Sequence, residues 1–193
     1  MRSTKMAAMI VAAGVLAGGC TSLLPKLYVG VALAGLVPED SETKMDIPLQ
    51  GDVFARVDMA ILEVEASYGI KTYQYEYSTG GGLTETGDLE AHPLALAAKL
   101  AIGPPQVHLL IGFGMVFDDF KSDDAQSLDS KDASTYRIIA GAEMKFSDFS
   151  FVAEGMYDLV DDTLTIDPLD PAASDVDVNL SGLMARVAIA YNF

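Results

Sequence analysis

The most constraining feature of this chain is a period-two alternation of large apolar residues with small, polar or charged ones. It is clearest in residues 26–37, 106–117 and 136–146. Within 106–117 every second side chain is large and apolar, whereas the positions between them include His108 and two glycines. Successive side chains of a β-strand point to opposite faces, so the alternation predicts strands with one apolar face. Small and charged residues on the other face indicate lipid outside and a polar lumen inside.

Five further segments follow the same pattern, which brings the number of expected strands to eight. The third is long for a bilayer, but its outward side is apolar only as far as Ile70, and about nine residues suffice for a tilted membrane strand. The strands are expected at residues 26–37, 52–58, 61–77, 94–102, 106–117, 136–146, 149–160 and 179–193. We therefore predict an all-β fold, an eight-stranded antiparallel up-and-down transmembrane β-barrel over residues 26–193.

The connections between the expected strands alternate between short and long, as in membrane barrels whose long loops lie on the outer side. The short ones lie near residues 59–60, 103–105 and 147–148, and the long ones cover 38–50, 78–90, 118–134 and 161–178. The chain has 28 acidic and 12 basic residues and a net charge of -16, yet its mean hydropathy is +0.27. Charged and apolar residues must therefore be segregated along the chain. Most of the acidic residues lie in the long connections.

The acidic balance excludes nucleic acid as a partner, because phosphate binding needs a footprint of lysine and arginine. It also argues against binding to an anionic lipid surface. Carboxylates in the last two long connections could supply oxygen ligands to Ca²⁺, although their spacing lacks the closing glutamate of an EF-hand loop. They are Asp123, Asp124, Asp129, Asp132, Asp161, Asp162, Asp167, Asp170, Asp175 and Asp177. Solvated, mutually repelling loops are the leading interpretation of this acidity. The alternative is that divalent cations bridge the loops to anionic lipopolysaccharide.

The first residues have the composition of an export signal. A positively charged start and an apolar run precede small residues and Cys20, the only cysteine. The run is shorter than the roughly 20 residues that cross a bilayer as a helix, so we expect residues 1–19 to be a cleaved signal peptide. Residues 16–20 resemble the lipobox of bacterial lipoproteins, with Ala17 where leucine is usual. Either Cys20 carries a lipid at the head of a short segment 20–25, or ordinary cleavage occurs at the same bond.

The last expected strand carries the most specific motif, because its outward apolar face is unbroken and ends on the aromatic C-terminal residue. The barrel-assembly machinery recognises a polar, small, aromatic, aromatic spacing, which is matched here by Arg186, Ala188, Tyr191 and Phe193. On these residues the chain resembles the opacity-type and OmpA-like family of eight-stranded outer-membrane barrels. The resemblance implies the cell outer membrane as location. It also implies outer-membrane lipid, lipopolysaccharide and the barrel-assembly machinery as partners.

The alternation also assigns charged side chains to the barrel interior. They are Arg56, Lys71, Lys99, Arg137, Lys145 and Arg186, together with Asp58, Glu63, Glu65, Glu143 and Glu154. Unpaired charges are expensive away from bulk water, so in a narrow barrel we expect an ion-paired network that fills the lumen. An ion-conducting or gated pore is the alternative. A soluble sandwich or lipocalin-like barrel would instead turn large apolar residues inward, where few are present.

Catalytic chemistry finds little support in the sequence. Some lipid-modifying barrels of this size use a histidine and a serine two residues apart, and neither His92 nor His108 has such a partner. We therefore expect no enzyme, no catalytic residues, no cofactor and no dedicated metal site. The leading function is a structural or surface-interaction role through the acidic outer loops. The alternatives are a narrow pore for ions or small solutes and, third, a lipid-modifying enzyme.

Overall fold

The computed structural model describes residues 25–38, 49–78, 84–122, 125–129, 134–160, 164–168, 176–178 and 181–193. Residues 1–24 lie outside the described residues, and with them the expected signal peptide (residues 1–19), Cys20 and most of the expected short segment 20–25. So do most of the acidic loop candidates, namely Asp123, Asp124, Asp132, Asp161, Asp162, Asp170 and Asp175. Of Asp129 and Asp177 only the backbone is described.

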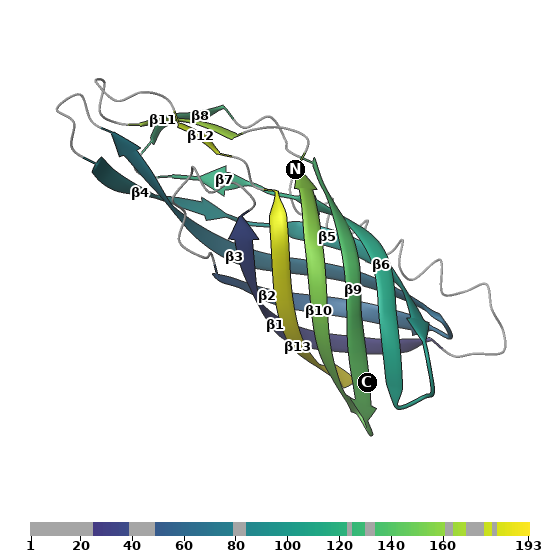
Figure 1. Ribbon diagram of the computed structural model, residues 1–193. Helices are drawn as coiled ribbons and strands as arrows, with labels where there is room; N and C mark the ends of the chain where they lie inside the picture. The colour runs from purple at the N-terminus through teal and green to yellow at the C-terminus, as the bar shows by residue number, and fades with distance from the viewer. Residues whose placement is uncertain are drawn as a thin grey trace.

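Eight long strands form a closed antiparallel barrel (Figure 1), which confirms the predicted fold. They are β1 (Lys26–Pro38), β2 (Leu49–Met59), β3 (Leu62–Ser78), β5 (Leu94–Ile102), β6 (Val107–Phe117), β9 (Ser134–Phe146), β10 (Phe149–Val160) and β13 (Gly182–Asn192). Each pairs with the next long strand along the chain, and β1 pairs with β13 to close the ring. The register at this seam runs from Tyr28 opposite Asn192 to Pro38 opposite Gly182.

The two ends of the barrel differ in their connections. We call one the turn end, because it holds the start of β1, the end of β13 and the three short turns that follow β2, β5 and β9. The other, the loop end, holds the long connections. Ala60 and Ser147 in two of the turns have φ values of 58° and 49°. Two-residue hairpins need such left-handed values, because they match the twist of the flanking strands.

Five shorter strands lie in connections that we expected to be loops, so that expectation is wrong for these segments. They are β4 (Thr84–Ala91), β7 (Phe120–Lys121), β8 (Ala125–Asp129), β11 (Leu164–Pro168) and β12 (Val176–Val178). β4 pairs with the outer half of β3, whereas β8, β11 and β12 form a separate three-stranded sheet. For β4 the physical reason is that β3 runs on beyond its pairing with β5, and its backbone groups there need a hydrogen-bonding partner.

The outer wall of the barrel is apolar, as a lipid-facing surface requires. Leu33, Leu109 and Val187 are 66%, 62% and 60% exposed, and other large apolar side chains surround the barrel in the same way. Water-soluble monomers rarely expose apolar patches larger than a few hundred Å². The described part of the chain contains no helix that is long and apolar enough to cross a bilayer.

Two apolar clusters occupy the interior on either side of its polar middle. The loop-side cluster joins barrel residues such as Met156 and Met184 to Leu89 of β4 and to Leu164 and Ile166 of β11. The separate sheet is therefore attached to the loop end through buried side chains. The second, which we call the turn-side apolar cluster, packs smaller side chains around the rings of Tyr28 and Phe54. Its other members are Ala32, Ala101, Leu110, Val152, Ala188 and Ala190.

Candidate functional site in the barrel lumen

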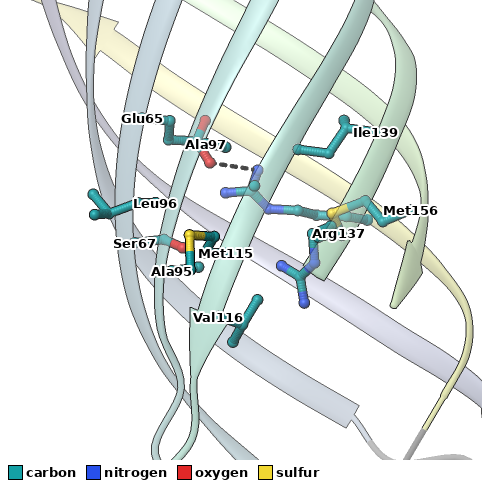
Figure 2. A pocket seen from close by; sticks show the side chains of 12 residues that line it. Glu65, Ser67, Ala95, Leu96, Ala97, Met115, Val116, Arg137, Ile139 and Met156 are labelled. Carbon is teal, nitrogen blue, oxygen red and sulfur yellow. Dashed lines mark hydrogen bonds and ion pairs between the residues drawn. The ribbon is translucent and has the colours of Figure 1, made fainter. Parts of the chain in front are cut away.

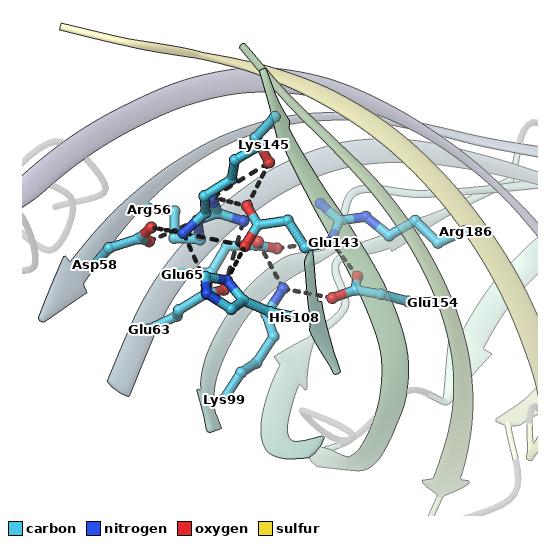
Figure 3. Close-up of polar contacts among 11 residues, drawn as sticks. Arg56, Asp58, Glu63, Glu65, Lys99, His108, Glu143, Lys145, Glu154 and Arg186 are labelled. Atoms are coloured by element: carbon cyan, nitrogen blue, oxygen red, sulfur yellow. Dashed lines mark hydrogen bonds and ion pairs between the residues drawn. The ribbon is translucent and has the colours of Figure 1, made fainter. Parts of the chain in front are cut away.

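The first part of the site is a set of charged residues near the turn end, which we call the turn-side cluster (Figure 3). It consists of Arg56, Asp58, Glu63, His108, Glu143 and Lys145. Arg56 is fully buried at its centre, where its guanidinium lies 2.5 Å from Glu143, 2.8 Å from Asp58 and 3.5 Å from Glu63. A planar guanidinium with five N–H donors is suited to contact several carboxylates at once.

Lys145 and His108 complete the turn-side cluster. The Lys145 ammonium lies 2.7 Å from Asp58, 3.1 Å from Glu143 and 3.7 Å from Glu63. Its side chain is 18% exposed, more than that of any other residue of the cluster. His108 Nδ1 lies 3.2 Å from a Glu143 oxygen. The second histidine of the chain is thus part of the lumen network and contacts the carboxylate that also pairs with Arg56.

A second group, the central cluster, forms an alternating square of two cations and two anions. Lys99 lies 2.8 Å from Glu65 and 2.6 Å from Glu154, and Arg186 lies 2.8 Å from each of the same carboxylates. Asp52 approaches Arg186 Nε at 3.5 Å. All five side chains are buried. Removing any one of the four side chains would leave its two oppositely charged neighbours with one ion-pair partner fewer. The four ion pairs therefore depend strongly on one another.

Toward the loop end, Arg137 and Asp158 form a two-pronged ion pair. Arg137 Nε and Nη2 donate to the two Asp158 oxygens at 2.6 Å and 2.8 Å. Lys71 is buried on the inward face of β3. The charged interior therefore extends from the turn-end mouth past the middle of the barrel.

The structure places all eleven residues of the predicted network inside the barrel. Ten of them lie in the ion pairs described above, and the eleventh, Lys71, is buried beside Tyr73. Sequence reasoning missed three buried members: Asp52, Ser150 and Asp158. Residues that are an even number of positions apart on a strand face the same side. Asp52 stands in this relation to Arg56 on β2, and Ser150 and Asp158 stand in it to Glu154 on β10, so the alternation itself could have identified them.

Aromatic rings support two of the arginines. The guanidinium carbon of Arg56 lies 4.6 Å from the centre of the Tyr28 ring, and that of Arg186 lies 4.8 Å from the centre of the Phe54 ring. Cations on ring faces are stabilised by the ring quadrupole, more so when both are buried. The network and the turn-side apolar cluster therefore pack as one unit.

The cavity beside the central cluster is small. A cavity of about 10 Å³ lies near the central cluster and the Arg137 pair, with Glu65, Ser67 and Met156 among its lining residues (Figure 2). A cavity needs about 10–15 Å³ of such volume to hold one water molecule. This part of the lumen is therefore filled by side chains.

The residues of the predicted assembly signal divide between the lumen and the outer wall. Arg186 and Ala188 point into the lumen, whereas Tyr191 and Phe193 are exposed on the outer wall. The ring centres of Tyr191 and Phe193 are 5.1 Å apart, and Phe149 lies 5.3 Å from Tyr191. Aromatic side chains at this height form the interfacial girdle of membrane barrels. The Phe193 amide also donates to the Leu27 carbonyl at 3.1 Å across the closing seam.

The two histidines do not form a joint catalytic site. His92 lies at the loop end, with Nε2 2.8 Å from Glu90 and Nδ1 3.4 Å from the Tyr68 hydroxyl. His108 lies in the lumen near the turn end. What the lumen offers chemically is a set of closely spaced carboxylates held among cations.

Comparison with known proteins gives one family and a set of similar folds. The profile of the family described as outer membrane protein beta-barrel domain matches residues 5–193. No curated protein matches the chain. The crystal structure of the outer membrane protein OprG from Pseudomonas aeruginosa has a TM-score of 0.69 at 15% identity, covering 87% of this chain and 95% of that one. Neisserial surface protein A (NspA) has a TM-score of 0.59 at 11% identity, covering 86% and 97%.

Proposed function

This chain belongs to the outer membrane protein β-barrel domain family, and we propose that it is a closed barrel that acts at its loop-end surface. The family and the apolar outer wall make it a protein of the cell outer membrane. In that membrane the turn end faces the periplasm and the long connections face outward, as is general for such barrels. The proposal concerns what the barrel does there: it presents a surface, and its lumen does not conduct.

The observation that carries this proposal is the ion-paired interior. Arg56, Lys99 and Glu143 are almost completely buried, and each contacts opposite charges from other strands. Barrels of eight strands have an interior only wide enough for their own side chains. To pass, a solute would have to break several buried ion pairs. Each broken pair would cost several kcal/mol, because it leaves a buried charge without its partner.

The loop end supports the surface role. Leu164 and Ile166 of β11 are 5% and 0% exposed and belong to one apolar cluster with Tyr73 of β3 and Leu89 of β4. Such packing holds the three-stranded sheet in place on the barrel. We propose that the acid-rich connections extend from this support and contact the environment, with divalent cations bridging them to lipopolysaccharide.

We propose no catalytic step for this chain. Hydrolysis at the lipid-facing wall would need a nucleophile that a histidine activates. Among the described residues His92 has Tyr68 and Glu90 as its side-chain contacts, at distances of 3.4 Å and 2.8 Å. The Tyr68 contact is at the long limit of a hydrogen bond, which does not favour proton transfer.

Conductance in planar bilayers separates the closed barrel from the narrow pore. The wild-type protein is expected to give no steady channels, because the central cluster fills the lumen. A variant with Glu65, Lys99, Glu154 and Arg186 all replaced by alanine removes the two cations and two of the three carboxylates, and it is expected to conduct. Both proteins need to show the same heat-modifiable migration, which verifies folding. Steady channels from the wild type would establish the pore for ions or small solutes.

Protease protection tests the bridging of loops to lipopolysaccharide. The folded protein is placed in vesicles with lipopolysaccharide and in matched phosphatidylcholine vesicles without it. Adding Ca²⁺ is expected to slow cleavage of the long connections only in the first set, because there the cation has anionic groups on both sides. Cleavage fragments are followed by mass spectrometry. Equal cleavage with and without Ca²⁺ in the lipopolysaccharide vesicles would show that the loops are simply solvated.

A further inference from the structure

We propose that the turn-side cluster binds a divalent first-row transition metal ion, with Zn²⁺ as the representative ion. Glu63, His108 and Glu143 are its ligands. Lys145 is a tethered cation that occupies the same position when no metal is bound. The site adds to the proposed surface role and departs from the expectation, drawn from the sequence, that the chain has no dedicated metal site.

The three ligands come from three different strands and converge on one point. One ligand atom each of Glu63, His108 and Glu143 lies within 4.8 Å of the others. Zinc binds nitrogen and oxygen ligands at about 2.0–2.2 Å, so in a tetrahedral site two ligand atoms are about 3.4 Å apart. The ligand atoms therefore need to approach one another by at most about 1.4 Å, a change that rotation about side-chain bonds can supply while β3, β6 and β9 stay in place.

An independent observation at Glu63 also favours coordination of a cation. Its side chain is 1% exposed, and neither carboxylate oxygen has a hydrogen-bond partner among the described residues. The nearest cations are Arg56 at 3.5 Å and Lys145 at 3.7 Å, both too far for a strong hydrogen bond. A buried carboxylate without such a bond is costly, and metal coordination would satisfy it.

The charges of the cluster match a divalent ion once Lys145 has left. With all three carboxylates ionised, as metal coordination requires, Asp58, Glu63 and Glu143 face Arg56 and Lys145, which leaves one excess negative charge. Without the Lys145 ammonium the excess is two, the charge that a divalent cation neutralises. The ammonium already lies among all three carboxylates, so this position is demonstrably suited to a cation.

Lys145 is also the residue of the cluster that can leave most easily. It is the most exposed member and stands two residues before the Ser147–Asp148 turn at the periplasmic mouth. Its flexible four-carbon stem allows the ammonium to move into water without a change in the backbone. The imidazole ligand selects Zn²⁺ and similar ions over Ca²⁺ and Mg²⁺, which prefer oxygen ligands.

Metal titration of the purified folded protein tests the site, with Co²⁺ as a coloured probe and Zn²⁺ as competitor. The wild type is expected to bind one Co²⁺ that Zn²⁺ displaces and excess Ca²⁺ does not. His108→Ala is expected to weaken binding by about tenfold or more, and His92→Ala, which removes the other histidine, is the matched control and should change nothing. Lys145→Met is expected to tighten binding by about tenfold, because the competing ammonium is gone.

Two further measurements keep the outcome clear. Heat-modifiable migration verifies that each variant is folded, and His108→Gln replaces His108→Ala if the latter is not. In the wild type, Zn²⁺ is expected to speed acylation of Lys145, read by mass spectrometry, because the metal displaces the ammonium into water. Binding that survives loss of His108, or that disappears with His92, would identify an adventitious surface ion and overturn the proposal. Unchanged affinity in Lys145→Met together with unchanged acylation would overturn the role of Lys145.

Discussion

Replacing Arg56 by methionine is expected to lower the free energy of unfolding by about 3–5 kcal/mol, the usual cost of removing one partner of a buried ion pair. Arg56 is fully buried and contacts Glu143, Asp58 and Glu63 within 3.5 Å. Methionine retains much of the volume but no charge. Three carboxylates would then share the single ammonium of Lys145, away from bulk water. Lys145 and Arg186 also contact three carboxylates each, but Arg56 is the most deeply buried of the three cations.

The measurement is urea-dependent unfolding of the protein in lipid vesicles, followed by heat-modifiable migration. Lys26→Met is the matched control, because Lys26 is exposed at the start of β1 and should change stability by no more than about 0.5 kcal/mol. The double variant Arg56→Met with Glu143→Gln is expected to recover part of the loss, since one unpaired charge is removed. An Arg56→Met protein as stable as the control would show that the network does not hold the barrel together.

Replacing Phe193 by alanine is expected to reduce the amount of protein in the outer membrane severalfold while leaving the stability of the assembled fraction nearly unchanged. Phe193 is 78% exposed, so it contributes little to the core. The substitution removes the terminal aromatic residue of the predicted assembly signal. The change thus separates recognition by the assembly machinery from folded-state packing.

Phe149→Ala is the matched control for this prediction. Phe149 lies 5.3 Å from Tyr191, close to the 5.1 Å between Tyr191 and Phe193, and it is exposed on the same wall. It lies outside the C-terminal signal, so the variant is expected to assemble at normal levels. Outer-membrane fractions are compared by immunoblot at equal expression. Normal levels of Phe193→Ala, or equal losses in both variants, would show that Phe193 acts only as a girdle residue.

The alternation along the chain was sufficient to predict which side chains face inward. An antiparallel strand has a strict two-residue period. Once one face is known to be apolar, the alternation therefore tells that Arg56, Glu65 and Glu143 lie on the other face. The same reasoning would have included Asp52 and Asp158. The eight long strands were predictable for the same reason, because membrane strands must have one continuous apolar face.

The alternation could not show which charged side chains contact one another. Arg186 and Glu65 are 121 residues apart and Arg56 and Glu143 are 87 apart, yet both pairs lie within 3 Å. Such contacts depend on how strands on opposite sides of the closed ring are staggered, and no local pattern encodes that stagger. The short strand β4 was missed for a related reason, because its partner is the part of β3 that extends past β5.

The sequence by itself therefore determined the class of fold, the outer-membrane location and the set of charges that enter the lumen, since all three follow from residue parity and the terminal motif. Only the tertiary structure decided that these charges form separate clusters. It also decided that Glu63, His108 and Glu143 converge beside Lys145 near the turn end of the barrel. The physical reason is that parity is a property of one strand, whereas a site inside a barrel is made where several strands meet across the ring.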